Sequence, residues 1–207
     1  MNKQLTEEEI SSAIQIQRKL MQLFPSTKWE FLNDLKLEFI DASQVPQPFK
    51  DLLCHENNLT AVLEKTYGGL NVEVLETYIT ADEIYNRLVN LNSPSGRILT
   101  HALLSVNLQN LPESMREAVK EGKVPFGRLL RKHVRERRVQ FKACWKVGSS
   151  FNQAILSNQK PSTYARTVVI VCNGLEAAEV LEIIVPELKK TTTGPENGVF
   201  VERACTC

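Results

Sequence analysis

Three charged residues, Arg87, Arg166 and Glu182, stand inside segments that otherwise have the composition of buried strands. Side chains alternate between the two faces of a strand, so each of these residues shares a face with apolar neighbours. A carboxyl group in such a place must either find a partner for its negative charge or stay protonated. A guanidinium is a suitable partner, because it offers two parallel donors to a carboxylate. These residue types predict a small enclosed pocket for an anionic ligand, in particular a carboxylate. A buried Arg–Glu salt bridge without any ligand fits the same spacing.

The segment 163–186, TYARTVVIVCNGLEAAEVLEIIVP, is predicted to be a β-hairpin that carries two of these residues. Asn173-Gly174 marks its turn, because both residues tolerate a positive φ, and the arms are rich in Val and Ile. Arg166 lies on an apolar face of the first arm and Glu182 on an apolar face of the second. The third charged residue, Arg87, lies in a predicted strand over 84–91.

The rest of the chain is predicted to supply helices and further strands around this hairpin. Thr6 and Glu9 form a capping box for a helix over 6–23. Residues 28–40 are predicted to be a loop or a short irregular element. Further helices are predicted at 48–54, at 57–66, after Pro112 and after Pro125, and further strands at 70–79, 97–107 and 134–147. The last of these strands is predicted to present one apolar face made of Val139, Phe141, Ala143, Trp145 and Val147.

This order of helices, strands, a short helical insert and more strands predicts an α+β fold. The sheet is expected to be mainly antiparallel, with about six strands and flanking helices. A chain of 207 residues is long enough for one sizeable domain. We expect this domain to cover residues 1–190 and to be followed by a flexible C-terminal tail, 191–207.

The composition excludes several classes of function. With a net charge of +1, the chain has no broad field that would favour nucleic acid or a membrane surface. No apolar run is long enough to span a bilayer, and the polar N-terminus is unlike a targeting peptide, so a cytoplasmic location is expected. The cysteine count of five is odd, and the three histidines are far apart. Cys144 and Cys172 are therefore predicted to be core residues, and no metal or cofactor is expected.

Several short motifs occur in an order that resembles the chorismate lyase family, also called 4-hydroxybenzoate synthases. The hairpin reads YART, then NG, then LEIIVP, which is similar to the family's arginine-bearing strand, glycine turn and acid-bearing strand ending in proline. The segment NRLVNL with Arg87 is similar to another family strand. Pro125-Phe126-Gly127-Arg128 and Leu59-Thr60 are similar to motifs at the starts of two helices. The resemblance covers roughly residues 52–188 and implies a chorismate lyase-like fold.

The hairpin also departs from the family pattern. The family has paired arginines before the turn, whereas here Arg166 is followed by Thr167, and the arm after the turn is one residue longer. This leaves two acids, Glu179 and Glu182, as candidates for the family's glutamate. Glu182 is preferred because it stands four residues before Pro186, as in the family.

The resemblance implies an enzyme that eliminates pyruvate from chorismate and leaves 4-hydroxybenzoate, a precursor in quinone biosynthesis. Aromatisation of the ring drives this reaction, so it needs no metal, nucleotide or redox cofactor. Glu182 is expected to be the catalytic general acid/base, and Arg87 and Arg166 to bind the substrate carboxylates. Phe126, Gly127 and Leu59 are expected to line the pocket and exclude water. An enclosed site of this kind is compatible with a monomer or a weak homo-oligomer.

A second class of protein fits the same residues. Ligand-sensing domains of some transcription regulators share this fold and bind small acids without chemistry. Such proteins usually carry a DNA-binding segment, and the roughly 50 residues before the resemblance begins are short for one. Arg87 together with Glu182 favours the enzyme.

Overall fold

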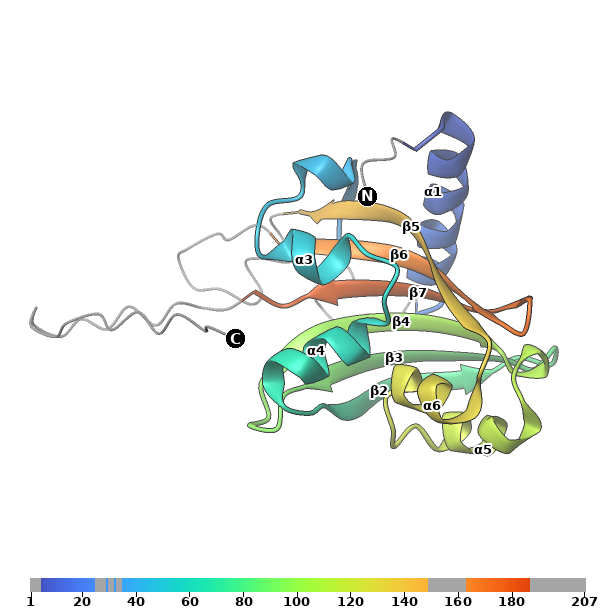
Figure 1. The fold of residues 1–207 in the computed structure, drawn as a ribbon. Coiled ribbons are helices and arrows are strands. Elements are labelled where there is room, and N and C mark those ends of the chain that lie inside the picture. The colour runs from blue at the N-terminus through green and yellow to red at the C-terminus, as the bar shows by residue number, and fades with distance from the viewer. Residues whose placement is uncertain (1–4, 25–28, 30–31, 33–34, 149–162, 187–207) are drawn as a thin grey trace, which may run out of the picture.

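A computed structural model describes residues 5–24, 29, 32, 35–148 and 163–186, and it shows an α+β fold built on one antiparallel sheet of seven strands (Figure 1). The strands are β1 Leu37–Ile40, β2 Asn71–Ile79, β3 Ile84–Asn92, β4 Ile98–Asn107, β5 Arg137–Val147, β6 Thr163–Cys172 and β7 Leu175–Ile184. The helices are α1 Glu7–Gln22, α3 Phe49–Leu53, α4 Leu59–Tyr67, α5 Glu113–Glu121 and α6 Phe126–His133, with single 3-10 turns at Ala42–Gln44 and Leu108–Asn110. Chain order and helix boundaries agree closely with the predictions.

The predicted hairpin lies at the centre of the sheet, whose strand order is β1-β5-β6-β7-β4-β3-β2. Its turn has φ values of 50° at Asn173 and 82° at Gly174, as a two-residue hairpin turn requires. β6 is buried along its whole length, because β5 and β7 flank it and helices cover the sheet. The two charged residues that it shares with β7 therefore lie in the interior.

Helices cover both faces of the sheet, so apolar clusters lie on each face. α1 packs across one face, where Leu20, Leu103 and Trp145 belong to one apolar cluster. Thr6 and Glu9 form the predicted capping box at its start. The helices α3 to α6 lie on the opposite face, as Figure 1 shows, above two further clusters. Arg87, Arg166 and Glu182 belong to this second face.

Two predictions about the strands were wrong. Residues 37–40 form the edge strand β1 rather than an irregular element, which raises the strand count from about six to seven. In β5 a register shift between Phe141 and Ala143 reverses the direction of the later side chains. Ala143 and Trp145 therefore pack in the α1 core, while Phe141 packs on the opposite face. The predicted single apolar face of this strand does not exist.

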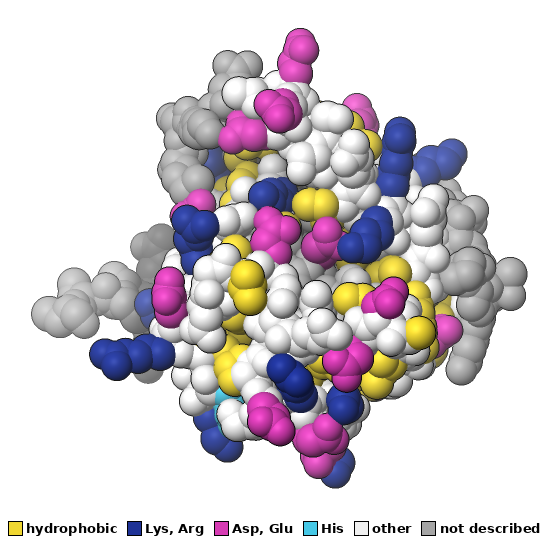
Figure 2. Space-filling view, turned by 90° about the vertical axis from the view of Figure 1, so that its right-hand side faces the viewer, with side chains coloured by type: hydrophobic (Ala, Val, Ile, Leu, Met, Phe, Trp, Pro, Cys, Tyr) yellow, Lys and Arg dark blue, Asp and Glu magenta, His cyan; other side chains and the backbone are white. Residues whose placement is uncertain are grey.

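Acidic and basic side chains are interspersed on the face seen in Figure 2, in keeping with the net charge of +1. Among the helices that the structure describes, none has the length and apolar character needed to cross a membrane. The predicted tail, 191–207, lies outside the described residues.

A buried histidine on β4 predicts that the protein loses stability in mild acid. The side-chain amide of Asn90 donates to the carboxylate of Glu73. Its Oδ1 lies 2.7 Å from Nδ1 of His101. Burial lowers the pKa of His101 from 6.5 to about 4, so the unfolded chain binds the extra proton first as the pH falls. Stability from this neutral imidazole is complete above about pH 6.5 and is lost on acidification towards pH 4. The difference corresponds to about 3 kcal/mol.

Urea unfolding at a series of pH values measures this effect. His101→Asn keeps a donor near the Nδ1 position and does not titrate, so its stability should fall less steeply between pH 6.5 and 4. A variant that shows the same slope as the wild type would contradict the assignment. His55 has a lowered pKa as well, because of burial and the nearby Arg166, so part of the slope remains in the variant.

Candidate functional site

Glu182 is held by Arg166 from the neighbouring strand. The two residues are directly opposite each other in the β6–β7 pair, and Nε of Arg166 donates to Oε2 of Glu182 at 2.6 Å. The side chain of Arg166 is 1% exposed and that of Glu182 is 12% exposed. This is a buried ion pair, in which each charge compensates the other in a poorly solvated place.

The rest of the Arg166 guanidinium binds the backbone of the segment 53–57, which joins α3 to α4. Nη1 donates to the carbonyl oxygen of His55 at 3.0 Å and approaches that of Leu53 at 3.4 Å. Nη2 donates to the carbonyl oxygen of Asn57 at 3.2 Å. Nδ1 of His55 accepts from the backbone N–H of Asn57 and lies 3.0 Å from Nη1. Arg166 therefore fixes this segment over the sheet at the same time as it holds Glu182.

Arg87 is a second buried guanidinium, and it has a different environment. Its side chain is among the largest fully buried ones, and its Nε and Nη1 have no hydrogen-bond partner. The hydroxyl of Tyr85, on the same strand face, is also without a partner. Burial lowers the pKa of Arg87. The hydroxyl of Tyr85 is an electrostatic neighbour of Arg87, and so is the ring of Phe126, whose centroid is 5.8 Å from Cζ.

The N-termini of α4 and α6 meet beside these residues. A Cβ atom at Gly127 would lie 2.0 Å from Oδ1 of Asn58, so only glycine allows this close approach. Neither N-cap residue, Asn58 or Pro125, makes a side-chain hydrogen bond to its helix. The first N–H groups of a helix have no intrahelical acceptor and carry partial positive charge. Two helix starts at one place therefore favour an anion.

The predicted site residues are thus brought to one face of the sheet, in two groups. Arg166 and Glu182 form one group. Arg87 and Phe126 form the other, and β4 separates the groups, since it pairs with β7 on one side and β3 on the other. Arg87 and Glu182 are two strand spacings apart across the sheet, about 10 Å, and are also offset by two residues along the strands. Leu59, 1% exposed, packs in a core cluster near the first group.

The register of β7 distinguishes the two candidate acids. Glu179 lies on the α1 face of the sheet, where Lys19 contacts it at 2.5 Å. Glu182 lies on the face that carries both arginines. Of the two acids, only Glu182 lies on the face of Arg87 and Arg166.

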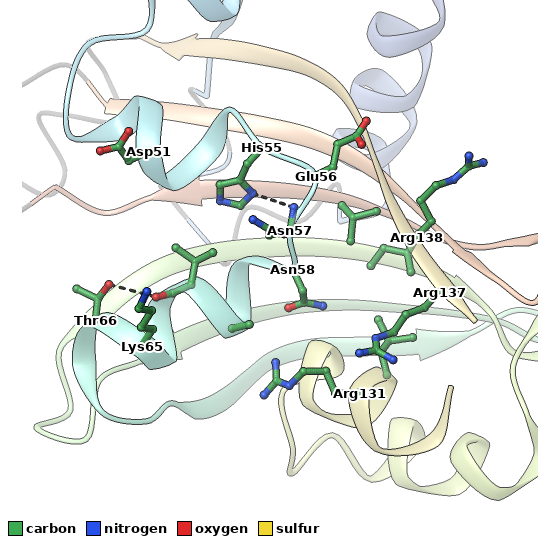
Figure 3. Close-up of a pocket in the computed structure, with 15 residues that line it drawn as sticks. Asp51, His55, Glu56, Asn57, Asn58, Lys65, Thr66, Arg131, Arg137 and Arg138 are labelled. Carbon is green, nitrogen blue, oxygen red and sulfur yellow. Dashed lines mark hydrogen bonds between the residues drawn. The ribbon is translucent and has the colours of Figure 1, made fainter. Parts of the chain in front are cut away.

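A pocket of about 920 Å³ lies next to this face, between the segment 55–58, α4, α6 and β5 (Figure 3). Arg131 from α6 and Arg137 from β5 face this segment across the pocket. The full set of charged lining residues is Lys65, Arg131, Arg137, Arg138, Asp51 and Glu56, an excess of two positive charges before His55 is counted. The basic run at 128–138 is mostly exposed, and three of its arginines, Arg131, Arg137 and Arg138, line this pocket.

Ion pairs hold the two helices that border this pocket. Glu64 of α4 accepts from Arg128 at 2.7 Å and also from Arg131 of α6. Nη1 of Arg131 is buried without a hydrogen-bond partner. Within the described part of the chain, no cluster of three or more His, Cys, Asp or Glu side chains could hold a metal ion.

Sequence reasoning missed the segment 53–57, which contributes backbone carbonyls rather than side chains to Arg166. The signal that could have identified it is the polar run His55-Glu-Asn-Asn58 between two short apolar helices. Comparison with known proteins adds no assignment: no protein-family model matches the chain, and no curated protein matches it significantly.

Proposed function

We propose that the protein is a chorismate lyase, which eliminates pyruvate from chorismate and releases 4-hydroxybenzoate. The order of motifs that resembles this family is the starting point. The structure adds support, because Arg87, Arg166 and Glu182 lie on one sheet face, beside the starts of the two helices that carry Leu59 and Phe126.

The buried guanidinium of Arg87, whose Nε and Nη1 have no hydrogen-bond partner, carries the proposal. A buried charge without a counter-ion is costly, and proteins retain one where a ligand supplies the missing charge. The free Nε and Nη1 atoms are donors on two edges of the guanidinium, each able to bind an anionic oxygen, and the helix starts favour the same sign of ligand. The ring of Phe126 next to Arg87 offers a flat apolar surface for an aromatic acid. The basic pocket beside segment 55–58 is not lined by any of these site residues, but its positive charge would attract a dianion to this side of the molecule.

In the proposed reaction the ether bond to the ring breaks while the neighbouring ring carbon loses its proton. The electron pair of that C–H bond completes the aromatic ring, and the expelled enolpyruvate takes up a proton to become pyruvate. Glu182 is the acid/base: its ion pair with Arg166 suits the carboxylate to accept the ring proton first, and the same carboxyl then protonates the departing group. No net proton, electron or cofactor is required.

Incubation of the purified protein with chorismate, followed by chromatography, tests the proposal. Equimolar 4-hydroxybenzoate and pyruvate are expected. The absence of both products at high protein concentration would refute the lyase.

Arg87→Met should separate ligand binding from folding. The thioether fills the buried space and removes the two unsatisfied donors, so the free energy of unfolding in urea should stay the same or rise by about 1–3 kcal/mol. Binding of 4-hydroxybenzoate, measured by calorimetry, should weaken by about 100-fold, since a hydrogen bond between charged groups contributes up to about 3 kcal/mol. Arg128→Met, on the α6 surface, is the matched control. Unchanged binding in Arg87→Met would show that Arg87 does not receive the carboxylate.

One observation favours the alternative, a sensor-type domain that binds a small acid without chemistry. Arg166 holds Glu182 and the segment 53–57 together, as a purely structural ion pair would. Tight binding of 4-hydroxybenzoate or a related acid without turnover of chorismate would identify the protein as such a sensor.

A further inference from the structure

Two free thiols lie in contact on the sheet face that carries Glu182. Cys54 follows α3, and its Sγ is 3.5 Å from Sγ of Cys144 on β5. Cys144 is buried and directly opposite Arg166 in the β5–β6 pair, whereas Cys54 is only half-buried. A disulfide requires a separation of about 2.05 Å between the sulfur atoms. An approach of roughly 1.5 Å therefore suffices for a bond.

The two sulfur atoms differ in reactivity. The hydrogen-bond contact with Cys144 lowers the pKa of Cys54 and outweighs burial, which raises it, and the charges of Lys50 and Arg166 also lower it. The same hydrogen bond and burial raise the pKa of Cys144. Because the thiolate is the nucleophile, Cys54 is the attacking group and Cys144 is the resolving one.

We infer that Cys54 and Cys144 form a reversible disulfide when the protein meets a small-molecule disulfide, and that this bond fixes the segment 53–57 on β5. The Cys54 thiolate attacks one sulfur of the small disulfide and expels a thiolate. Cys144 gives its proton to that thiolate and attacks Sγ of Cys54, which expels the second thiolate. Two protein thiols are oxidised, and one small disulfide is reduced to two thiols.

The bond would act on the candidate site through the backbone. Segment 53–57 supplies the carbonyl groups that bind Arg166, and it leads into the start of α4 at Asn58. A covalent link at Cys54 therefore restrains both the Arg166–Glu182 pair and the junction of α4 with α6. Because the two cysteines are 90 positions apart, the link also restricts the unfolded chain.

The test uses the full chain with Cys205→Ser and Cys207→Ser, which removes two competing thiols near the C-terminus. The protein is incubated with oxidised glutathione, alkylated, digested with trypsin and examined by mass spectrometry. We expect a linked pair of the peptides 51–65 and 143–146, which reduction separates. The Tm should rise by several degrees on oxidation, and the amide hydrogens of residues 54–62 should exchange more slowly.

Cys54→Ser should abolish the link, the rise in Tm and the slower exchange together. Cys172→Ser, which alters another buried cysteine, should leave all three unchanged. A stable adduct of glutathione on Cys54, or recovery of both cysteines as thiols at equilibrium with excess oxidised glutathione, would overturn the inference. None of these readouts depends on turnover of chorismate, so the inference and the proposed function fail independently.

Discussion

Replacement of Glu182 by glutamine is expected to reduce the turnover of chorismate by about 10²–10⁴-fold, the usual contribution of general acid/base catalysis. This corresponds to about 3–5 kcal/mol of activation free energy. Glutamine keeps an oxygen that accepts from Nε of Arg166, so the fold should persist. Binding of 4-hydroxybenzoate should change far less than the rate, because proton transfer and not affinity has been removed. Rates at saturating chorismate and calorimetric binding of the product measure the two effects.

Glu179→Gln is the matched control, since Glu179 lies on the same strand and its side chain contacts Lys19 on the opposite face of the sheet. Its turnover should equal that of the wild type. If Glu182→Gln kept wild-type turnover, the acid/base assignment would be wrong, whatever the outcome for binding. If Glu179→Gln instead lost turnover, the choice between the two acids would have to be reversed.

Arg166→Met is expected to destabilise the protein by about 3–5 kcal/mol in urea unfolding. The substitution leaves the carboxylate of Glu182, 12% exposed, without its partner in the interior, and breaking a buried pair from one side has a cost of this size. It also removes the donors that bind the carbonyl groups of segment 53–57. Hydrogen exchange in that segment should therefore accelerate.

Two comparisons isolate the cause. Arg128→Met breaks an ion pair with Glu64 in which the arginine is 44% exposed, and it should cost no more than about 1 kcal/mol. The double variant Arg166→Met/Glu182→Leu replaces both charges by apolar groups and should recover part of the lost stability. A double variant less stable than Arg166→Met would show that the cost arises from segment 53–57 and not from the uncompensated carboxylate.

The sequence predicted those elements whose signals are local. Asn173-Gly174 between two Val- and Ile-rich arms defined the hairpin, and the capping box at Thr6 defined the start of α1. The three charged residues on apolar strand faces were identified because a period of two is strict along a regular strand. Their common face of the sheet was not predicted: a register shift between Ile170 and Val171 in the β6–β7 pair brings Glu182, and not Leu181, opposite Arg166.

The missed features depend on contacts that leave no pattern in the sequence. β1 has four residues and lies at the sheet edge, so it is too short for a period to appear. The register shift after Phe141 inverts the faces of β5, and no glycine or proline marks it. The environment of Arg166 consists largely of backbone carbonyl groups, which every residue type possesses. The sequence predicted either a ligand pocket or a structural salt bridge. Arg166 forms a salt bridge, while Nε and Nη1 of Arg87 have no hydrogen-bond partner.

The central position of the β6–β7 hairpin has a consequence for how the chain is made. Among the strands of the sheet, these two leave the ribosome last, yet β4 and β5 are their neighbours in space. Before they emerge, the nascent chain can pair only β2 with β3 and β4, and β1 with β5, which gives two half-sheets with open edges. Such edges pair readily with other chains. Productive folding is therefore a late event, in which β6 and β7 join the two half-sheets. If translation stops before residue 163, the fragment keeps the open edges, is prone to aggregate and lacks both Arg166 and Glu182.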